Sequence, residues 1–262
     1  MTSSATLSAE LREAVTGRTL TVVYQPLFDL RGEGMPRHPV AVEALCRWQH
    51  PRLGMIVPDR FIPLAEAEGL MEDLGAAVLD EACARVSAWQ HAGYDLGLSV
   101  NASPSQFSPA FAASLSERTA RLGLRPGSLT IEITEAPAPQ LLPSVIELLP
   151  ALRTANVKVS IDDFGAGDLT LDVLEDVRVD EVKIDRSLTQ RDDAEADAVI
   201  ASVLERAAHF GWRIVAEGIE TVADLERSRR RGCEVGQGYL LGKPMPADDL
   251  GRVLEAARRE PR

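Results

Sequence analysis

The chain has 262 residues, of which 45% are hydrophobic and 26% are charged, as in an ordinary globular protein. Its formal net charge of −12 repels nucleic acid duplexes and other polyphosphates at long range, so we expect no DNA or RNA duplex as a partner. No apolar run approaches the roughly 20 residues that cross a bilayer, so we expect no membrane span. Residues 1–20 lack the apolar core of a secretory signal, so we expect a cytoplasmic protein. The three cysteines are scattered, which argues against a disulfide framework.

Hydrophobic periodicity predicts helices and strands in alternation along the chain. We expect a short helix at residues 8–17, strands at 20–30 and 40–48 joined by a loop, and two helices within 58–94. Further strands are expected at 96–100, 129–134, 157–163, 181–184, 213–216 and 238–241. Helices are expected at 105–122, 143–156, 169–177, 194–210, 222–231 and 247–257.

About eight strand and helix pairs are typical of a closed (β/α)8 barrel, an α/β fold that needs about 250 residues. No linker rich in Gly, Ser or Pro divides the chain. We therefore predict one domain over residues 1–262, with its core at about 20–246. The active site of such a barrel lies at the C-terminal ends of the strands.

The stretch 157–167 (VKVSIDDFGAG) runs from a β-branched segment into two adjacent carboxylates and a glycine loop. Asp162 and Asp163 therefore lie where a predicted strand ends. One interpretation is that they only end the strand and cap the next helix. The other is that they belong to a site at the mouth of the barrel.

Polar residues on several other predicted strands favour the second interpretation. They are Glu43, Asn101, Glu132, Lys183 and Glu217. With the Asp pair they give five carboxylates and one amide, which are hard oxygen ligands that suit Mg²⁺, Mn²⁺ or Ca²⁺ and not zinc or copper. Two divalent ions and one lysine would offset so much negative charge, as in two-metal sites that cleave phosphodiesters. Taken singly, Asn101 could be a turn residue and Lys183 a snorkelling side chain.

Seven motifs together resemble the EAL-domain family of cyclic di-GMP phosphodiesterases. They are EALCRWQHP from Glu43, SVNASPSQF around Asn101, EITE at 132–135, DDFGAG from Asp162, VKIDRS around Lys183, AEGIET around Glu217 and GQGYLLGKP around Gln237. The match runs in order from about Tyr24 to Pro246, which is nearly the whole chain.

The resemblance implies a barrel whose first strand is antiparallel to the others, and hydrolysis of cyclic di-GMP to linear 5′-pGpG. It implies that two metal ions are bound by Glu43, Asn101, Glu132, Asp162, Asp163 and Glu217. Lys183 would hold or deprotonate the attacking water, and Glu135 would anchor the loop after Asp163. Substrate and supporting contacts would come from Gln25, Leu45, Arg47, Asp185 and Gln237. The family also implies a homodimer formed through the region after Asp163.

One segment departs from the family pattern. In the loop at residues 166–171, active members usually have an aromatic residue, two small residues and then leucine, where this chain has Asp168, Leu169, Thr170 and Leu171. The change alters packing and charge beside the predicted metals, and outer contacts of this kind support metal ligands. A second hypothesis therefore stays open, in which the chain is a cyclic di-GMP receptor or interaction module with little or no turnover.

Overall fold

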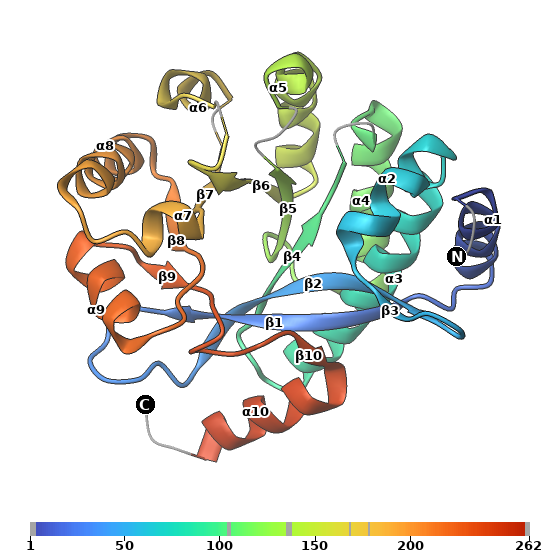
Figure 1. Ribbon diagram of the computed structural model, residues 1–262, viewed down its shortest axis with the longest axis horizontal. Coiled ribbons are helices and arrows are strands. Elements are labelled where there is room, and N and C mark those ends of the chain that lie inside the picture. The colour runs from blue at the N-terminus through green and yellow to red at the C-terminus, as the bar shows by residue number, and fades with distance from the viewer. Residues whose placement is uncertain (1–3, 104–105, 135–137, 168, 178, 260–262) are drawn as a thin grey trace.

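The computed structural model describes residues 4–103, 106–134, 138–167, 169–177 and 179–259. Its centre is a closed barrel of eight strands (Figure 1). In barrel order these are β1 (Thr21–Asp29), β2 (Pro39–His50), β4 (Gly97–Asn101), β5 (Leu129–Thr134), β6 (Val157–Phe164), β7 (Glu181–Ile184), β8 (Arg213–Ala216) and β9 (Val235–Gly236). The predicted barrel is therefore confirmed.

The first strand runs against its neighbours, as predicted. β1 pairs antiparallel with β2 on one side and with β9 on the other, which closes the barrel. The remaining neighbours, from β2 through β4 to β9, pair in parallel. Two short strands extend the edges: β3 (Gly54–Ile56) pairs with β2, and β10 (Met245–Pro246) pairs with β1.

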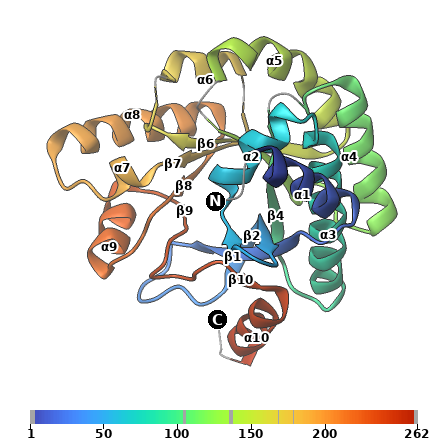
Figure 2. The ribbon, with the colours of Figure 1, turned by 45° about the vertical axis from the view of Figure 1, so that its right-hand side comes forward.

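Helices follow one another around the outside of the barrel in sequence order (Figure 1). They are α2 (Pro58–Ala67), α3 (Met71–His91), α4 (Pro109–Leu122), α5 (Ala138–Thr154), α6 (Leu171–Val177), α7 (Arg186–Thr189), α8 (Ala194–Phe210) and α9 (Val222–Arg231). α1 (Ser4–Thr16) packs beside α2 and α3, and α10 (Ala247–Arg259) packs on β1 and β10 (Figure 2). None of the helices in the described part of the chain is both long and apolar enough to cross a membrane.

Local sequence signals set where several helices begin. The side chains of Ser108, Asp193 and Thr221 accept hydrogen bonds from backbone N–H groups in the first turns of α4, α8 and α9. Each of these three helices ends at a glycine with positive φ, a conformation that glycine adopts without strain. The N-terminal caps lie where βα connections end, on the side of the barrel mouth.

The predicted strand at residues 238–241 is wrong. The last barrel strand is Val235–Gly236, and residues 238–241 form a turn in which the N–H groups of Leu241 and Gly242 donate to the Gly238 carbonyl. The backbone at Gly238 lies so close to Ile219 that a Cβ would come within 2.2 Å of the Ile219 carbonyl oxygen. The turn therefore needs glycine, and it carries the chain across the barrel mouth. α5 also begins earlier than predicted, with Pro143 inside the helix.

Candidate active site

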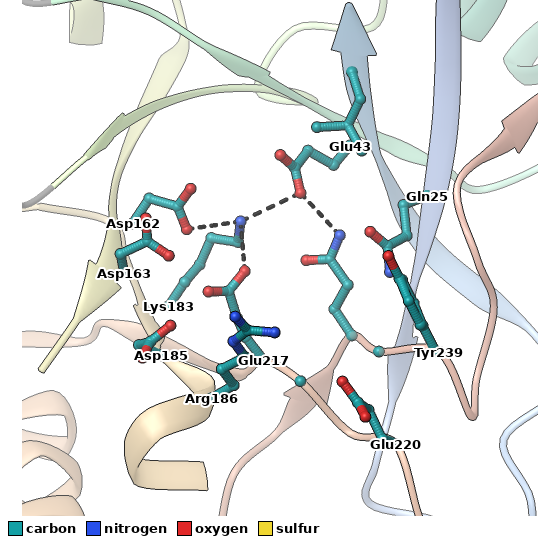
Figure 3. A pocket seen from close by; sticks show the side chains of 14 residues that line it. Gln25, Glu43, Asp162, Asp163, Lys183, Asp185, Arg186, Glu217, Glu220 and Tyr239 are labelled. Atoms are coloured by element: carbon teal, nitrogen blue, oxygen red, sulfur yellow. Dashed lines mark hydrogen bonds and ion pairs between the residues drawn. The ribbon is translucent and has the colours of Figure 1, made fainter. Parts of the chain in front are cut away.

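Lys183 lies at the centre of a cluster of carboxylates inside the barrel mouth (Figure 3). It projects from β7 and is fully buried. Its Nζ lies 2.8 Å from Asp162 Oδ1, 2.9 Å from Glu217 Oε1, 3.2 Å from Glu132 Oε2 and 3.3 Å from Glu43 Oε2. The carboxylates expected from the sequence therefore converge on one ammonium group.

Each carboxylate comes from a different strand, which is why residues far apart in sequence meet. Glu43 lies on β2, Glu132 on β5 and Asp162 on β6, while Glu217 directly follows β8. Parallel strands end at the same rim of the barrel, so their polar C-terminal residues share one mouth. Asn101 lies opposite Glu132 in the β4–β5 pair.

A β-bulge places Asp162 and Asp163 side by side. The β6–β7 register shifts between Ile161 and Phe164, and Asp163 has a φ of 57°. In a regular strand, adjacent side chains point to opposite faces, so the left-handed residue breaks this alternation. Figure 3 shows both carboxylates facing the Lys183 side of the cavity. The adjacent acids first interpreted as possible caps thus belong to the cluster.

Two amides fix the carboxylate of Glu43. Asn101 Nδ2 donates to Glu43 Oε1 at 2.8 Å, and Gln237 Nε2 donates to Glu43 Oε2 at 2.8 Å. Lys183 contacts the same Oε2. A carboxylate held by three donors has a defined orientation, which is a requirement of a preorganised site.

The donor set fits divalent metal ions. Ligand atoms of Glu43, Glu132 and Asp162 lie within 4.8 Å of one another, and so do those of Asp162, Asp163 and Glu217. The two groups share Asp162, so its carboxylate could serve two neighbouring ions. Glu132 Oε1 is buried without a hydrogen-bond partner among the described residues, so this oxygen is available to bind a cation.

Burial and neighbouring charges perturb the pKa values of the residues in the cluster. Burial, reinforced by neighbouring carboxylates, raises the pKa of Glu132 well above its usual value, that of Glu217 to about 8 and that of Asp163 to about 6. Burial alone would lower the pKa of Lys183, but the surrounding carboxylates raise it well above its usual value. Burial opposes the ionisation of Glu43, yet Lys183, Gln237 and Asn101 hold its pKa below the usual value.

A cavity of about 430 Å³ opens onto the cluster. Of the residues expected to contact substrate, Gln25, Leu45, Asp185 and Gln237 line it. Gln25 donates to the Gly242 carbonyl, and Asp185 caps α7 by accepting from the Ser187 N–H. Arg47 is not among the described lining residues, because its guanidinium folds back to the Cys46 carbonyl. Glu135 lies outside the described residues.

The cavity also contains side chains that the sequence analysis missed. Arg186, Glu220 and Tyr239 line it, and all three are exposed (Figure 3). Tyr239 is 58% exposed, and Lys243 Nζ lies 5.4 Å from the centroid of its ring. The sequence contains a signal for two of them, because Arg186 directly follows Asp185 and Tyr239 lies two residues after Gln237, and both Asp185 and Gln237 are expected substrate contacts. The loops that follow barrel strands also supply binding residues.

The unusual loop after the Asp pair is partly described. Leu169 is 7% exposed and belongs to the hydrophobic core, while Ala166 and Gly167 are exposed. Asp168 lies outside the described residues. The leucine in this loop therefore has a packing role.

The model of one protein family matches residues 8–244, and its description is the EAL domain. The chain belongs to the EAL domain family. The match agrees with the resemblance and covers every candidate site residue.

Two similar relatives are proteins of Pseudomonas aeruginosa. This EAL domain is 38% identical over 245 residues to the bifunctional diguanylate cyclase/cyclic di-GMP phosphodiesterase MucR, covering 92% of this chain and 35% of MucR. It is 36% identical over 260 residues to the cyclic di-GMP phosphodiesterase NbdA, covering 96% of this chain and 32% of NbdA. The chain thus spans about a third of the length of these relatives.

Solved structures show the same fold. The PaMucR phosphodiesterase in complex with c-di-GMP has a TM-score of 0.83 at 38% identity, covering 93% of this chain and 99% of that chain. The EAL domain of Mycobacterium smegmatis DcpA has a TM-score of 0.73 at 30% identity, covering 90% of this chain and 96% of that chain.

Proposed function

We propose that this EAL domain hydrolyses one phosphodiester bond of cyclic di-GMP to give linear 5′-pGpG, with two Mg²⁺ or Mn²⁺ ions. The observation that carries the proposal is the convergence of Glu43, Glu132, Asp162 and Glu217 on Lys183 at the floor of an open cavity. Membership of the family supports the substrate, as do the relatives named as cyclic di-GMP phosphodiesterases.

The metal ligands would be Glu43, Asn101, Glu132, Asp162, Asp163 and Glu217. Two bound divalent ions would lower the pKa of an attacking water and offset charge that develops on the phosphate. Asn101 and Gln237 orient Glu43 through their donated hydrogen bonds. Glu135 is proposed, from its place in the EITE motif, to anchor the loop after Asp163.

Lys183 is better suited to hold the attacking water than to deprotonate it. Its pKa in the metal-free protein lies well above the usual value, so it remains an ammonium group. An ammonium donates hydrogen bonds and accepts none. It therefore keeps the carboxylates together and can orient an oxygen nucleophile beside them.

Arg186 is proposed as a phosphate contact, and Arg47 remains a substrate contact proposed from the family resemblance. Lys183 and Arg186 are the cations among the described residues that line the cavity. Because Lys183 is enclosed by carboxylates, Arg186 is the guanidinium left to make charge-assisted hydrogen bonds to a phosphate oxygen. Gln25, Leu45, Asp185 and Gln237 remain proposed contacts around the substrate.

Tyr239 is proposed as a platform for a guanine base. Its ring is exposed at the cavity wall, and stacking on an aromatic ring contributes about 1–3 kcal/mol per base. We expect Tyr239→Ala to raise KM for cyclic di-GMP about tenfold with little change in kcat, and Tyr239→Phe to keep the KM of the unaltered protein. Steady-state kinetics measures both constants. An unchanged KM in the Tyr239→Ala variant would refute the proposal that Tyr239 stacks on a guanine base.

Metal binding is expected to release protons. Glu217, with a pKa of about 8, is largely protonated at pH 7 in the metal-free protein, whereas a cation takes the deprotonated carboxylate. The apparent affinity for Mg²⁺ should therefore rise as the pH increases from 6 toward 8. Calorimetry in two buffers of different ionisation enthalpy measures the released protons. A binding enthalpy that is the same in both buffers would contradict the proposal.

The proposal is tested by incubating the purified chain with cyclic di-GMP and Mn²⁺ and separating the nucleotides by chromatography. We expect 5′-pGpG to accumulate, and we expect none when EDTA removes the metal. The departure at residues 166–171 favours one alternative, a cyclic di-GMP receptor. Binding by calorimetry without product would establish the receptor and refute the enzyme. The cytoplasmic location and the homodimer through the region after Asp163 remain predictions.

A further inference from the structure

The interior of the barrel has an apolar side and a polar side. Leu27, Ala41, Val215 and Val235, from β1, β2, β8 and β9, form a small buried apolar cluster of their own. The four consecutive strands β4 to β7 instead place polar side chains in the interior. Barrel interiors are usually filled by branched apolar residues, so the polar side requires an explanation.

Four buried oxygens on this polar side have no hydrogen-bond partner among the described residues. They are Ser99 Oγ, Glu132 Oε1, Ser160 Oγ and Glu181 Oε1, one from each of β4, β5, β6 and β7. The residues are at most 1% exposed. A bound metal ion would account for Glu132 Oε1, but the other three oxygens belong to none of the carboxylate groups that could hold an ion.

Strand register makes these residues neighbours on one face. Glu132 is paired with Ser160 across β5 and β6, and Ser160 is paired with Glu181 across β6 and β7. Partners in register project to the same side of a sheet. Glu132 points inward to Lys183, so Ser160 and Glu181 also point inward. Ser160 thus lies between two buried carboxylates.

Of these three residues, Glu181 lies nearest the end of the barrel that is opposite the cavity. Glu181 is the first residue of β7, and its Oε2 accepts from the half-exposed guanidinium of Arg213. Its Oε1 has no partner among the described residues. An unpaired buried polar atom costs about 1–3 kcal/mol, and buried water commonly satisfies such atoms in globular proteins.

We propose that enclosed water molecules bridge Ser160 Oγ to the carboxylates of Glu132 and Glu181, and that Ser160 is a positioning residue for the metal ligand Glu132. A serine hydroxyl has one donor and two acceptor sites, so it can hold a water on either side. The water bridge restrains the Glu132 carboxylate, which Lys183 also contacts. The role of Ser160 toward metal rests on the proposed function, whereas the enclosed water does not.

The first test is a high-resolution crystal structure of the metal-free protein. We expect ordered water within hydrogen-bond distance of Ser160 Oγ and of Glu181 Oε1. The Ser160→Ala variant should lose the water at residue 160. An interior without water at these oxygens, or a direct hydrogen bond from Ser160 to either carboxylate, would overturn the proposed bridge.

The second test is the affinity for Mn²⁺ measured by calorimetry. Because removal of a group that supports a metal ligand typically costs 10–100-fold in affinity, we expect Ser160→Ala to bind Mn²⁺ about tenfold more weakly at a nearly unchanged melting temperature. The matched control is Ser87→Ala, which removes a buried hydroxyl from α3 that donates to the Gly123 carbonyl. Its Mn²⁺ affinity should equal that of the unaltered protein.

The outcomes separate this inference from the proposed function. If the unaltered protein binds Mn²⁺ and Ser160→Ala binds it equally well, the positioning role is refuted while the metal site stands. If the unaltered protein binds no Mn²⁺, the proposed function and the positioning role both fail, and the crystal structure alone decides whether the water bridge exists.

Discussion

Replacement of Glu43 by alanine is expected to lower the proposed hydrolysis of cyclic di-GMP by about 1,000-fold. Transition-state stabilisation by a bound metal would be worth several kcal/mol, and each 1.4 kcal/mol is tenfold in rate. Glu43 lies in one of the two carboxylate groups that could hold an ion and accepts hydrogen bonds from Asn101 and Gln237. The variant thus removes a ligand and leaves two amides without their acceptor. Formation of 5′-pGpG over time measures the loss.

The control for this variant is Glu205→Ala, which removes an exposed carboxylate on α8. Its turnover should match that of the unaltered protein. Circular dichroism should show that both variants are folded. A folded Glu43→Ala protein that retains more than a tenth of the turnover would show that the metal assignment is wrong.

Replacement of Lys183 by methionine is expected to lower the free energy of unfolding of the metal-free protein by about 3–5 kcal/mol, the typical cost of removing one partner from a buried ion pair. Four carboxylates lie within 3.3 Å of the Lys183 ammonium, and methionine fills a similar volume without the charge. Urea unfolding with and without Mn²⁺ measures the effect. Divalent ions should restore part of the lost stability, because they supply the missing positive charge.

The matched control is Lys158→Met, which removes an exposed lysine on β6. We expect it to change the free energy of unfolding by less than about 0.5 kcal/mol. If Lys183→Met unfolds at the same urea concentration as Lys158→Met, the buried ammonium does not hold the carboxylates together in the way described above.

The barrel could be predicted from sequence because segments with the hydrophobic period of a strand alternate along the chain with segments that have the period of a helix. The antiparallel first strand came from the family resemblance, and pairing of β1 with β2 and β9 confirms it. The final strand was misplaced, since periodicity does not reveal that Gly238 packs directly against the Ile219 backbone. A strand of two residues, such as Val235–Gly236, is too short to give a periodic signal.

The convergence of Glu43, Glu132, Asp162 and Glu217 followed from one physical rule, that parallel strands end at the same rim of a barrel. That rule does not predict the direction in which an individual side chain points. Arg47 bonds to a neighbouring carbonyl instead of entering the cavity, and the bulge at Asp163 depends on one residue with positive φ. Such features depend on side-chain rotamers and backbone dihedral angles that a pattern of residue types does not record.

The most direct test of the metal site is the number of divalent ions that the chain binds. Mn²⁺ can be titrated into metal-free protein and the bound metal measured by calorimetry and by elemental analysis after gel filtration. Two ions per chain are expected, with both sites lost or weakened in Glu43→Ala. Binding of no ion, or of one ion that is unaffected by Glu43→Ala, would contradict a two-metal centre on these carboxylates.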